Sequence, residues 1–158
     1  MNHKIEKKEA FGFSGMTRTF SMEDGKNFVA IPKFWNELMV DGRFEIMMRK
    51  STDGKCVGVC MPKIPAMENS FDYIIGIFSE KGVPGYDYHE VPSVEWAIFE
   101  VRGPIGKELQ KTCKYIMSEW SPKAGYERAN LPELEVYHAG DVNDKDYLTE
   151  IWVPIQEK

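Results

Sequence analysis

Two segments near the end of the sequence each place a glutamate two positions before an aromatic residue: Glu135 before Tyr137, and Glu150 before Trp152. Both segments have the composition of β-strands, in which alternate side chains point to the same face. Each carboxylate is therefore expected to share a face with its own ring. A carboxylate among rings is costly unless that face is hydrated or binds a ligand. This pairing suits a lipophilic cation, because the carboxylate supplies charge and the rings supply cation–π contact.

Further aromatic residues could belong either to a binding site or to the core. Tyr73 and Trp96 lie on expected strands, and Trp35 and Trp120 lie at the ends of helical stripes. The spacing leaves both interpretations open for each of them. For an arbitrary strand glutamate, a solvated face is the usual alternative to a site.

Other kinds of site chemistry lack a matching pattern. The histidines are scattered, and His138 follows Tyr137, so it should face away from Glu135. The three cysteines have no second Cys/His pair nearby, which favours reduced structural thiols over disulfides or a zinc site. Phosphate-binding glycine loops and dinucleotide fingerprints are also missing from the sequence. We therefore expect no metal and no cofactor.

The composition favours a folded protein that does not bind nucleic acid. The chain has 158 residues, of which 42% are hydrophobic and 13% aromatic, enough for a sizeable core. Its net charge of -5 argues against direct nucleic-acid binding, which depends on Lys and Arg. No apolar run approaches the length of a membrane span. We expect a soluble, cytoplasmic protein without membrane contact.

Hydrophobic periodicity predicts the same order of elements twice. In the first half we expect a strand over 5–20, a helix that begins near Ile31 or is kinked at Pro32 and ends before Gly42, a strand over 55–61, a loop over 62–70 and a strand over 71–79. Residues 81–92 read as a joint. In the second half we expect a strand over 93–102, a helix opened by Gly103 and Pro104 and running to Trp120, and strands over 134–137 and 148–155.

The repeated β-α-β-β order predicts an α+β fold made by duplication. We expect a single domain over 1–158, with pseudo-repeats at about 1–80 and 88–158. Two such modules, each with antiparallel strands, would be related by a pseudo-twofold axis. A groove between the halves is then the natural place for a ligand.

Three segments carry a resemblance to a known family: Phe34–Leu38, Trp120–Tyr126, and Leu131–Tyr137 followed by Glu150–Ile155. Through them the chain resembles the GyrI-like family, also described as the AraC-type effector-binding domain. The resemblance covers essentially the whole chain. It implies a duplicated β-α-β-β module whose groove binds lipophilic, often cationic compounds through a buried glutamate and aromatic residues.

By motif position, the resemblance assigns ligand binding to Glu135 and Glu150, with Trp152 as the aromatic partner of Glu150. Together with the aromatic set above, the predicted site comprises Glu135, Glu150, Tyr137, Trp152, Tyr73, Trp96, Trp35 and Trp120. The two strands would form one wall of the groove, and Tyr73 would contribute to the other wall.

The sequence has no helix-turn-helix region, so direct transcriptional activation is not expected. The leading expectation is a stand-alone protein that binds lipophilic, cationic small molecules. Stand-alone members of the family imply two alternatives. One is a hydrolase of electrophilic, cyclopropane-containing xenobiotics, in which Glu135 or Glu150 would be catalytic. The other is an interaction module that inhibits gyrase.

Overall fold

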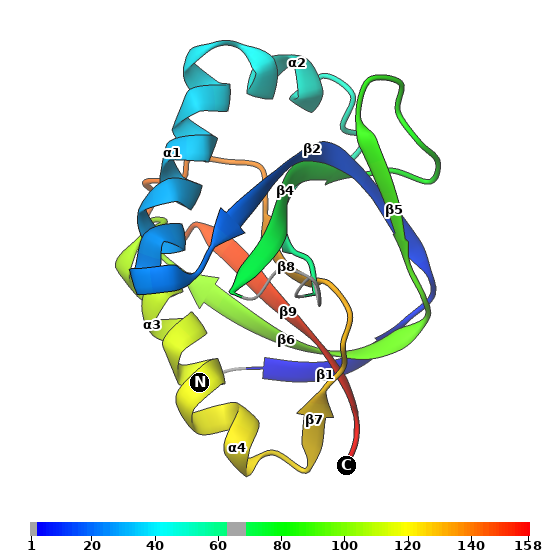
Figure 1. The fold of residues 1–158 in the computed structure, drawn as a ribbon, viewed down its shortest axis with the longest axis vertical. Helices are drawn as coiled ribbons and strands as arrows, with labels where there is room; N and C mark the ends of the chain where they lie inside the picture. Colours follow the sequence, from blue (N-terminus) through cyan, green and yellow to red (C-terminus); the bar gives the residue numbers. More distant parts are fainter. Residues whose placement is uncertain (1–2, 63–68) are drawn as a thin grey trace.

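The computed structural model describes residues 3–62 and 69–158, and within them nine strands form one antiparallel sheet. The strand order is β1-β6-β9-β8-β3-β4-β2-β5. β7 pairs with the C-terminal end of β9, beyond the residues that pair with β8. Figure 1 shows the sheet strongly curved, with α1 and α3 on the same side of it. The α+β class with antiparallel strands is thus confirmed.

The strands are β1 His3–Lys8, β2 Phe11–Ser21, β3 Cys56–Cys60, β4 Ser70–Phe78, β5 Asp87–Val91, β6 Val94–Arg102, β7 Tyr126–Arg128, β8 Glu133–Tyr137 and β9 Leu148–Glu157. The helices are α1 Lys26–Val40, α2 Arg43–Met48, α3 Lys107–Tyr115 and the short α4 Ser121–Lys123. A 3-10 turn, Glu23–Gly25, precedes α1, and a π-helical turn, Ile116–Trp120, joins α3 to α4.

The strand order is symmetric about the β3–β8 pair. On one side follow β4 and β2, and on the other β9 and β6, so corresponding strands of the two expected modules occupy corresponding places. The outer strands are exchanged, because β1 pairs with β6 and β5 pairs with β2. The two halves therefore share one continuous sheet. Their origin by duplication and the boundaries of the pseudo-repeats stay predictions.

Two strand predictions are wrong. The single strand expected over 5–20 is two strands, which separate at Glu9 and Ala10 and join opposite ends of the sheet. The expected joint over 81–92 contains β5, which pairs along the start of β2. Because residues 81–92 are rich in Gly, Pro and Tyr, this short strand could not be recognised from the sequence. Most of the predicted loop over 62–70 lies outside the described residues.

The helix predictions need smaller corrections. α1 begins at Lys26 and continues through Pro32, which is exposed, while Phe34 and Leu38 are buried against the sheet. Gly42 follows α1 with a positive φ of 86°, as expected of a glycine after a helix, but it also precedes α2, which was not predicted. α3 begins at Lys107 rather than at Gly103 and Pro104, because Gly106 has a φ of 145°, which is incompatible with a helix.

Three groups of buried side chains hold these layers together. One lies between α1 and strands β2 and β4 and includes Phe20, Phe34 and Leu38. A second lies between α3 and strands β6 and β9 and includes Phe99 and Ile151. The third, which we call the inner cluster, contains strand residues alone: Phe13, Val57, Val59, Ile74, Val91, Trp96, Ile98, Leu134, Val136 and Trp152. The helices therefore cover one face of the sheet, and the inner cluster fills the other.

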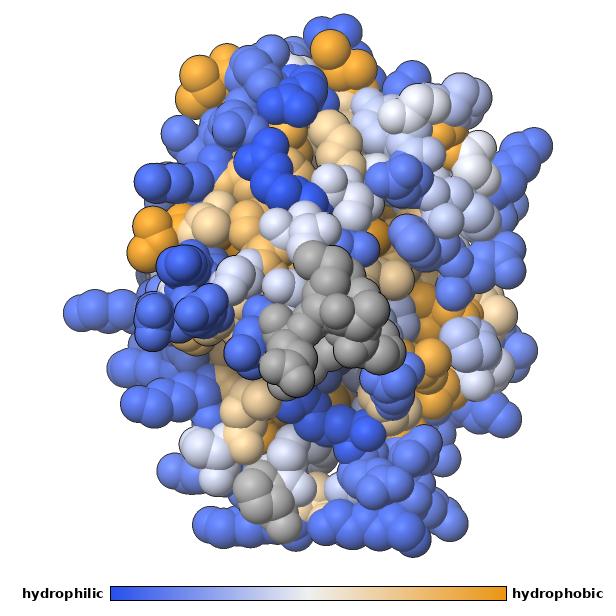
Figure 2. Space-filling model, in the orientation of Figure 1, coloured by the Kyte–Doolittle hydropathy of each residue, from blue (hydrophilic) through white to orange (hydrophobic). Residues whose placement is uncertain are grey.

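The surface around these layers is mostly hydrophilic in the view of Figure 2. Hydrophobic side chains reach it over α1 and α2, where Phe28, Val40 and Ile46 are exposed. Across the described part of the chain, no helix combines the length and the apolar character that a bilayer crossing requires.

Candidate ligand-binding site

The two glutamate–aromatic pairs lie on opposite faces of the sheet. In the β8–β9 register, Glu135 is opposite Ile151, whereas Glu150 is opposite Val136. Directly opposed residues of an antiparallel pair share a face. Glu135 and Tyr137 therefore face the helices, while Glu150 shares the other face with Trp152. The expectation that both pairs form one wall is wrong, because the register offsets the two motifs by one residue.

On the helix-covered face, the central strands gather a polar and aromatic group around Glu135. We call this group the Glu135 cluster: Glu135, Tyr137, Tyr73, Trp35, Cys60 and Cys113. β3 runs between β8 and β4, with Gly58 opposite Glu135 and Cys60 opposite Tyr73. The cluster thus lies at the centre of the strand order. α1 contributes Trp35, and α3 contributes Cys113.

Hydrogen bonds and ring contacts fix the aromatic side chains of this cluster. The Tyr137 hydroxyl donates to Glu135 Oε2 at 3.1 Å. Trp35 Nε1 donates to the Tyr73 hydroxyl at 2.9 Å, and its ring meets the Tyr137 ring edge-on with centroids 5.3 Å apart. Trp35 therefore ties α1 to the central strands.

Glu135 is a carboxylate without a cationic partner among the described residues. Glu133, two positions earlier on the same face, is paired with Arg128, but no Lys, Arg or His in the described ranges forms an ion pair with Glu135. Burial raises the pKa of Glu135, and hydrogen bonds from Tyr137 and Tyr73 oppose that shift. Part of the side chain still reaches solvent. The site therefore holds an acidic group that no cationic side chain of the described residues compensates.

Gly58 makes room for this arrangement. A Cβ atom at this position would lie 2.1 Å from the Tyr73 hydroxyl and 3.3 Å from Trp35 Cζ2. The absence of a side chain on β3 thus lets Tyr73 and Trp35 close over the strand beside Glu135. A glycine inside the otherwise β-prone 56–60 stretch is a sequence signal for such a close approach.

Cys60 and Cys113 belong to the cluster although the sequence pointed only to structural thiols. Both are partly accessible. Burial raises the pKa of the Cys113 thiol to about 12, with Glu135 adding to the shift, and raises the pKa of Cys60 well above its ordinary value. The two thiols are therefore neutral, and they offer soft, polarizable contacts rather than nucleophiles.

The remaining predicted residues lie elsewhere. Trp96 is fully buried in the inner cluster, and Trp152 joins it there with 8% of its surface exposed. Glu150 is bonded to His138, with Nε2 and Oε1 2.8 Å apart. Trp120 is on the helix side, but it packs edge-on against Phe99 of β6 at 5.0 Å. The structure thus brings together Glu135, Tyr137, Tyr73 and Trp35 and separates them from Glu150, Trp152 and Trp96.

A metal site has no candidate ligand set in the described ranges, since no three His, Cys, Asp or Glu side chains are grouped there for a metal ion.

Several solved structures share this fold. SAV2435 bound to tetraphenylphosphonium superimposes with a TM-score of 0.86 at 20% identity, over 99% of this chain and 94% of that one. A putative bacterial transcription regulation protein from Staphylococcus aureus MU50 gives 0.79 at 22% identity, over 99% of both chains. The C-terminal domain of EcmrR gives 0.62 at 17% identity, over 99% and 98%. At these identities the likeness establishes the fold alone.

Sequence comparison gives the family. No curated protein sequence matches the chain. The family model of the GyrI-like small molecule binding domain, however, matches residues 1–156, essentially the whole length. The chain therefore belongs to the GyrI-like family of small-molecule-binding domains.

Proposed function

We propose that the protein binds lipophilic organic cations at the Glu135 cluster. The observation that carries the proposal is the Glu135 carboxylate, which is surrounded by aromatic side chains and has no cationic partner among the described residues. An ionised carboxylate in such surroundings is costly unless a counter-charge reaches it. A cation from solution supplies that charge.

The surroundings of Glu135 favour an organic cation over a hydrated metal ion. The rings of Tyr137, Tyr73 and Trp35 pack beside the carboxylate, and Cys60 and Cys113 add polarizable sulfur. Rings attract cations through their π faces and bury apolar surface at the same time. SAV2435, which shares the fold, was solved with tetraphenylphosphonium bound, and this ion has the charge and the apolar shell that the cluster favours.

The test compares two ions of the same shape and opposite charge. Tetraphenylphosphonium and tetraphenylborate carry the same four phenyl groups, so their hydrophobic contributions are closely matched. Calorimetric titration should show the phosphonium binding about a hundredfold more tightly, or better, because Glu135 attracts one ion and repels the other. Equal binding of the two ions would mean that apolar contact alone holds them, and no binding of the phosphonium would refute the proposal.

Hydrolysis of an electrophilic xenobiotic is a second candidate, favoured by the raised pKa of Glu135 beside the Tyr137 hydroxyl. A carboxyl group with a raised pKa can exchange protons closer to neutral pH. Consumption of a cyclopropane-containing electrophile in molar excess over the protein, lost in Glu135→Gln, would indicate catalysis. Uptake limited to one equivalent would indicate binding.

Inhibition of gyrase and a cytoplasmic location stay predictions. A supercoiling assay with added protein tests the inhibition of gyrase.

A further inference from the structure

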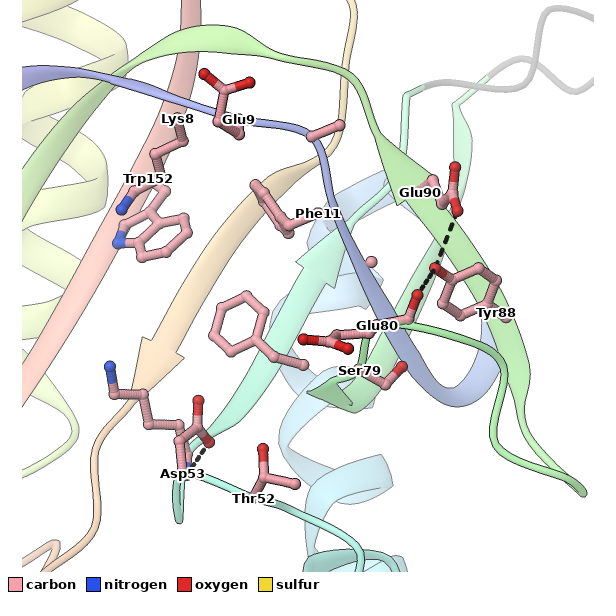
Figure 3. A pocket seen from close by; sticks show the side chains of 14 residues that line it. Lys8, Glu9, Phe11, Thr52, Asp53, Ser79, Glu80, Tyr88, Glu90 and Trp152 are labelled. Carbon is pink, nitrogen blue, oxygen red and sulfur yellow. Dashed lines mark hydrogen bonds between the residues drawn. The ribbon is translucent and has the colours of Figure 1, made fainter.

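An open pocket lies on the face of the sheet opposite Glu135. It is an open cavity of about 680 Å³, within the range of small-molecule sites, and it shares no residue with the Glu135 cluster. Figure 3 shows Lys8, Glu9 and Phe11 along the corner between β1 and β2, with the Lys8 side chain beside Trp152 of β9. The inner cluster therefore opens to solvent at this point.

Three aromatic side chains form the floor of this pocket: Phe11, Phe78 and Trp152. The Phe78 and Trp152 rings are stacked, with centroids 5.6 Å apart, and Phe11 meets each of them edge-on at 5.7 and 5.9 Å. The set thus presents a rigid aromatic surface. Phe11 and Phe78 are only partly buried, so some of that surface is accessible.

The Trp152 ring already accepts a cation. Lys8 Nζ lies 4.5 Å from the centre of this ring. This ammonium group also lies 3.4 Å from Glu6 Oε2, and about a quarter of its side chain is exposed. The contact shows that the ring face is oriented for cation–π attraction and that a lysine side chain occupies this position.

The rim of the pocket is acidic. Four lining residues carry carboxylates, Glu9, Asp53, Glu80 and Glu90, against the two ammonium groups of Lys8 and Lys55. The Tyr88 hydroxyl donates toward the Glu80 carbonyl oxygen at 3.0 Å and the Glu90 carboxylate at 3.1 Å, which fixes β5 against the end of β4 (Figure 3). A positively charged ligand is therefore favoured over an anionic one.

We propose that this pocket is a second ligand site, which takes a planar aromatic cation onto the Phe11, Phe78 and Trp152 surface. The ligand ring stacks on the floor, its charge lies near the acidic rim, and Lys8 moves aside from Trp152. The site is independent of Glu135, because the sheet separates the two. One chain then binds two cations, one on each face.

The indole N–H signals in nuclear magnetic resonance spectra separate the two sites, with N-methylacridinium as the probe. Trp35 reports on the Glu135 cluster and Trp152 on the pocket. We expect the Trp152 signal to shift saturably in the wild type and equally in Glu135→Gln, whether or not the Trp35 signal responds. A Trp152 signal that does not move, or whose shift disappears in Glu135→Gln, would overturn the proposal. Failure of the Glu135 site alone would leave the Trp152 response intact.

A second experiment measures how charge variants on the rim of the pocket change the affinity for N-methylacridinium. Glu80→Gln and Glu90→Gln are exposed changes and should each weaken binding about threefold, and about tenfold together, as expected for exposed charges. Lys8→Gln should tighten binding about threefold, because it removes the competing ammonium group. Glu119→Gln, an exposed change in the helical segment on the other face, is the matched control and should have no effect. Unchanged affinity in the rim double variant, or weaker binding in Lys8→Gln, would refute a cation site.

Discussion

Replacing Glu135 with Gln should weaken tetraphenylphosphonium binding about a hundredfold. The substitution keeps the size of the side chain and its capacity to accept a hydrogen bond from Tyr137, but it removes the charge. Because the described residues supply no cation to Glu135, the whole loss falls on the attraction between the ligand and this carboxylate.

The size of the loss follows from Coulomb attraction. If the phenyl groups hold the phosphorus about 5.5 Å from the carboxylate, the attraction at an effective dielectric constant of about 20 is about 3 kcal/mol. Since about 1.4 kcal/mol corresponds to a factor of ten, the affinity changes by about a hundredfold. The surroundings of Glu135 justify this dielectric constant, because rings and the strand backbone replace much of the water around it.

Isothermal titration calorimetry at neutral pH measures the effect, with Glu150→Gln as the matched control. Glu150 is also a strand glutamate two positions before an aromatic residue, but it faces the other side of the sheet and is bonded to His138. The control should bind the ligand as the wild type does. If Glu135→Gln binds within about threefold of the wild type, or if Glu150→Gln loses as much affinity, the Glu135 cluster is not the site.

Four further predictions concern the face of the sheet that carries Glu135. Because burial raises the pKa of Glu135, phosphonium affinity should fall as the pH is lowered through that raised value. The phosphonium affinity of Glu135→Gln should not change over the same pH range. Calorimetric titrations at several pH values measure both affinities. In the free protein, burial destabilises the ionised form of the Glu135 carboxyl group. The contribution of Glu135 to thermal stability should therefore decrease as the pH rises from its ordinary pKa to its raised pKa, and Glu135→Gln should lack this decrease. Gly58→Ala should cost about 1–3 kcal/mol of unfolding free energy in denaturant titration and weaken binding, because its Cβ would displace Tyr73; unchanged stability would contradict this close approach. Cys56 and Cys113, whose pKa values burial raises to about 12, should react far more slowly with iodoacetamide at pH 8 than the free amino acid, as followed by mass spectrometry.

Much of the fold followed from local patterns. Alternation of apolar residues located the cores of β3, β4, β6, β8 and β9, and helical spacing located α1 and α3. Two short strands were not recognised: the sequence of β5, Asp87–Val91, is mostly polar and shows no apolar alternation, and β7 has only three residues. The break between β1 and β2 escaped as well, because residues 5–20 have strand composition throughout, and only pairing with different partners shows that they are two strands.

The site was predicted in part, for a related reason. Sequence alone placed Glu135 beside Tyr137 and Glu150 beside Trp152, and each pair does share a face. It gave no reason to include Cys60 or Cys113, whose positions matter only because β3 and α3 lie near β8. The sequence also gave no sign that Trp152 lines a pocket on the other face, since the corner between β1 and β2 comes from the other end of the chain.

The sequence by itself determined the family, the α+β class and the direction of each side chain relative to its neighbours on the same strand. These properties are local, because they depend on residue types and on an alternation of period two. The tertiary structure decided which carboxylate meets which rings. A strand register shifted by one residue moves every side chain to the opposite face. The β8–β9 and β8–β3 registers therefore placed Glu135 with Gly58 and Tyr73 and sent Glu150 and Trp152 to the far side.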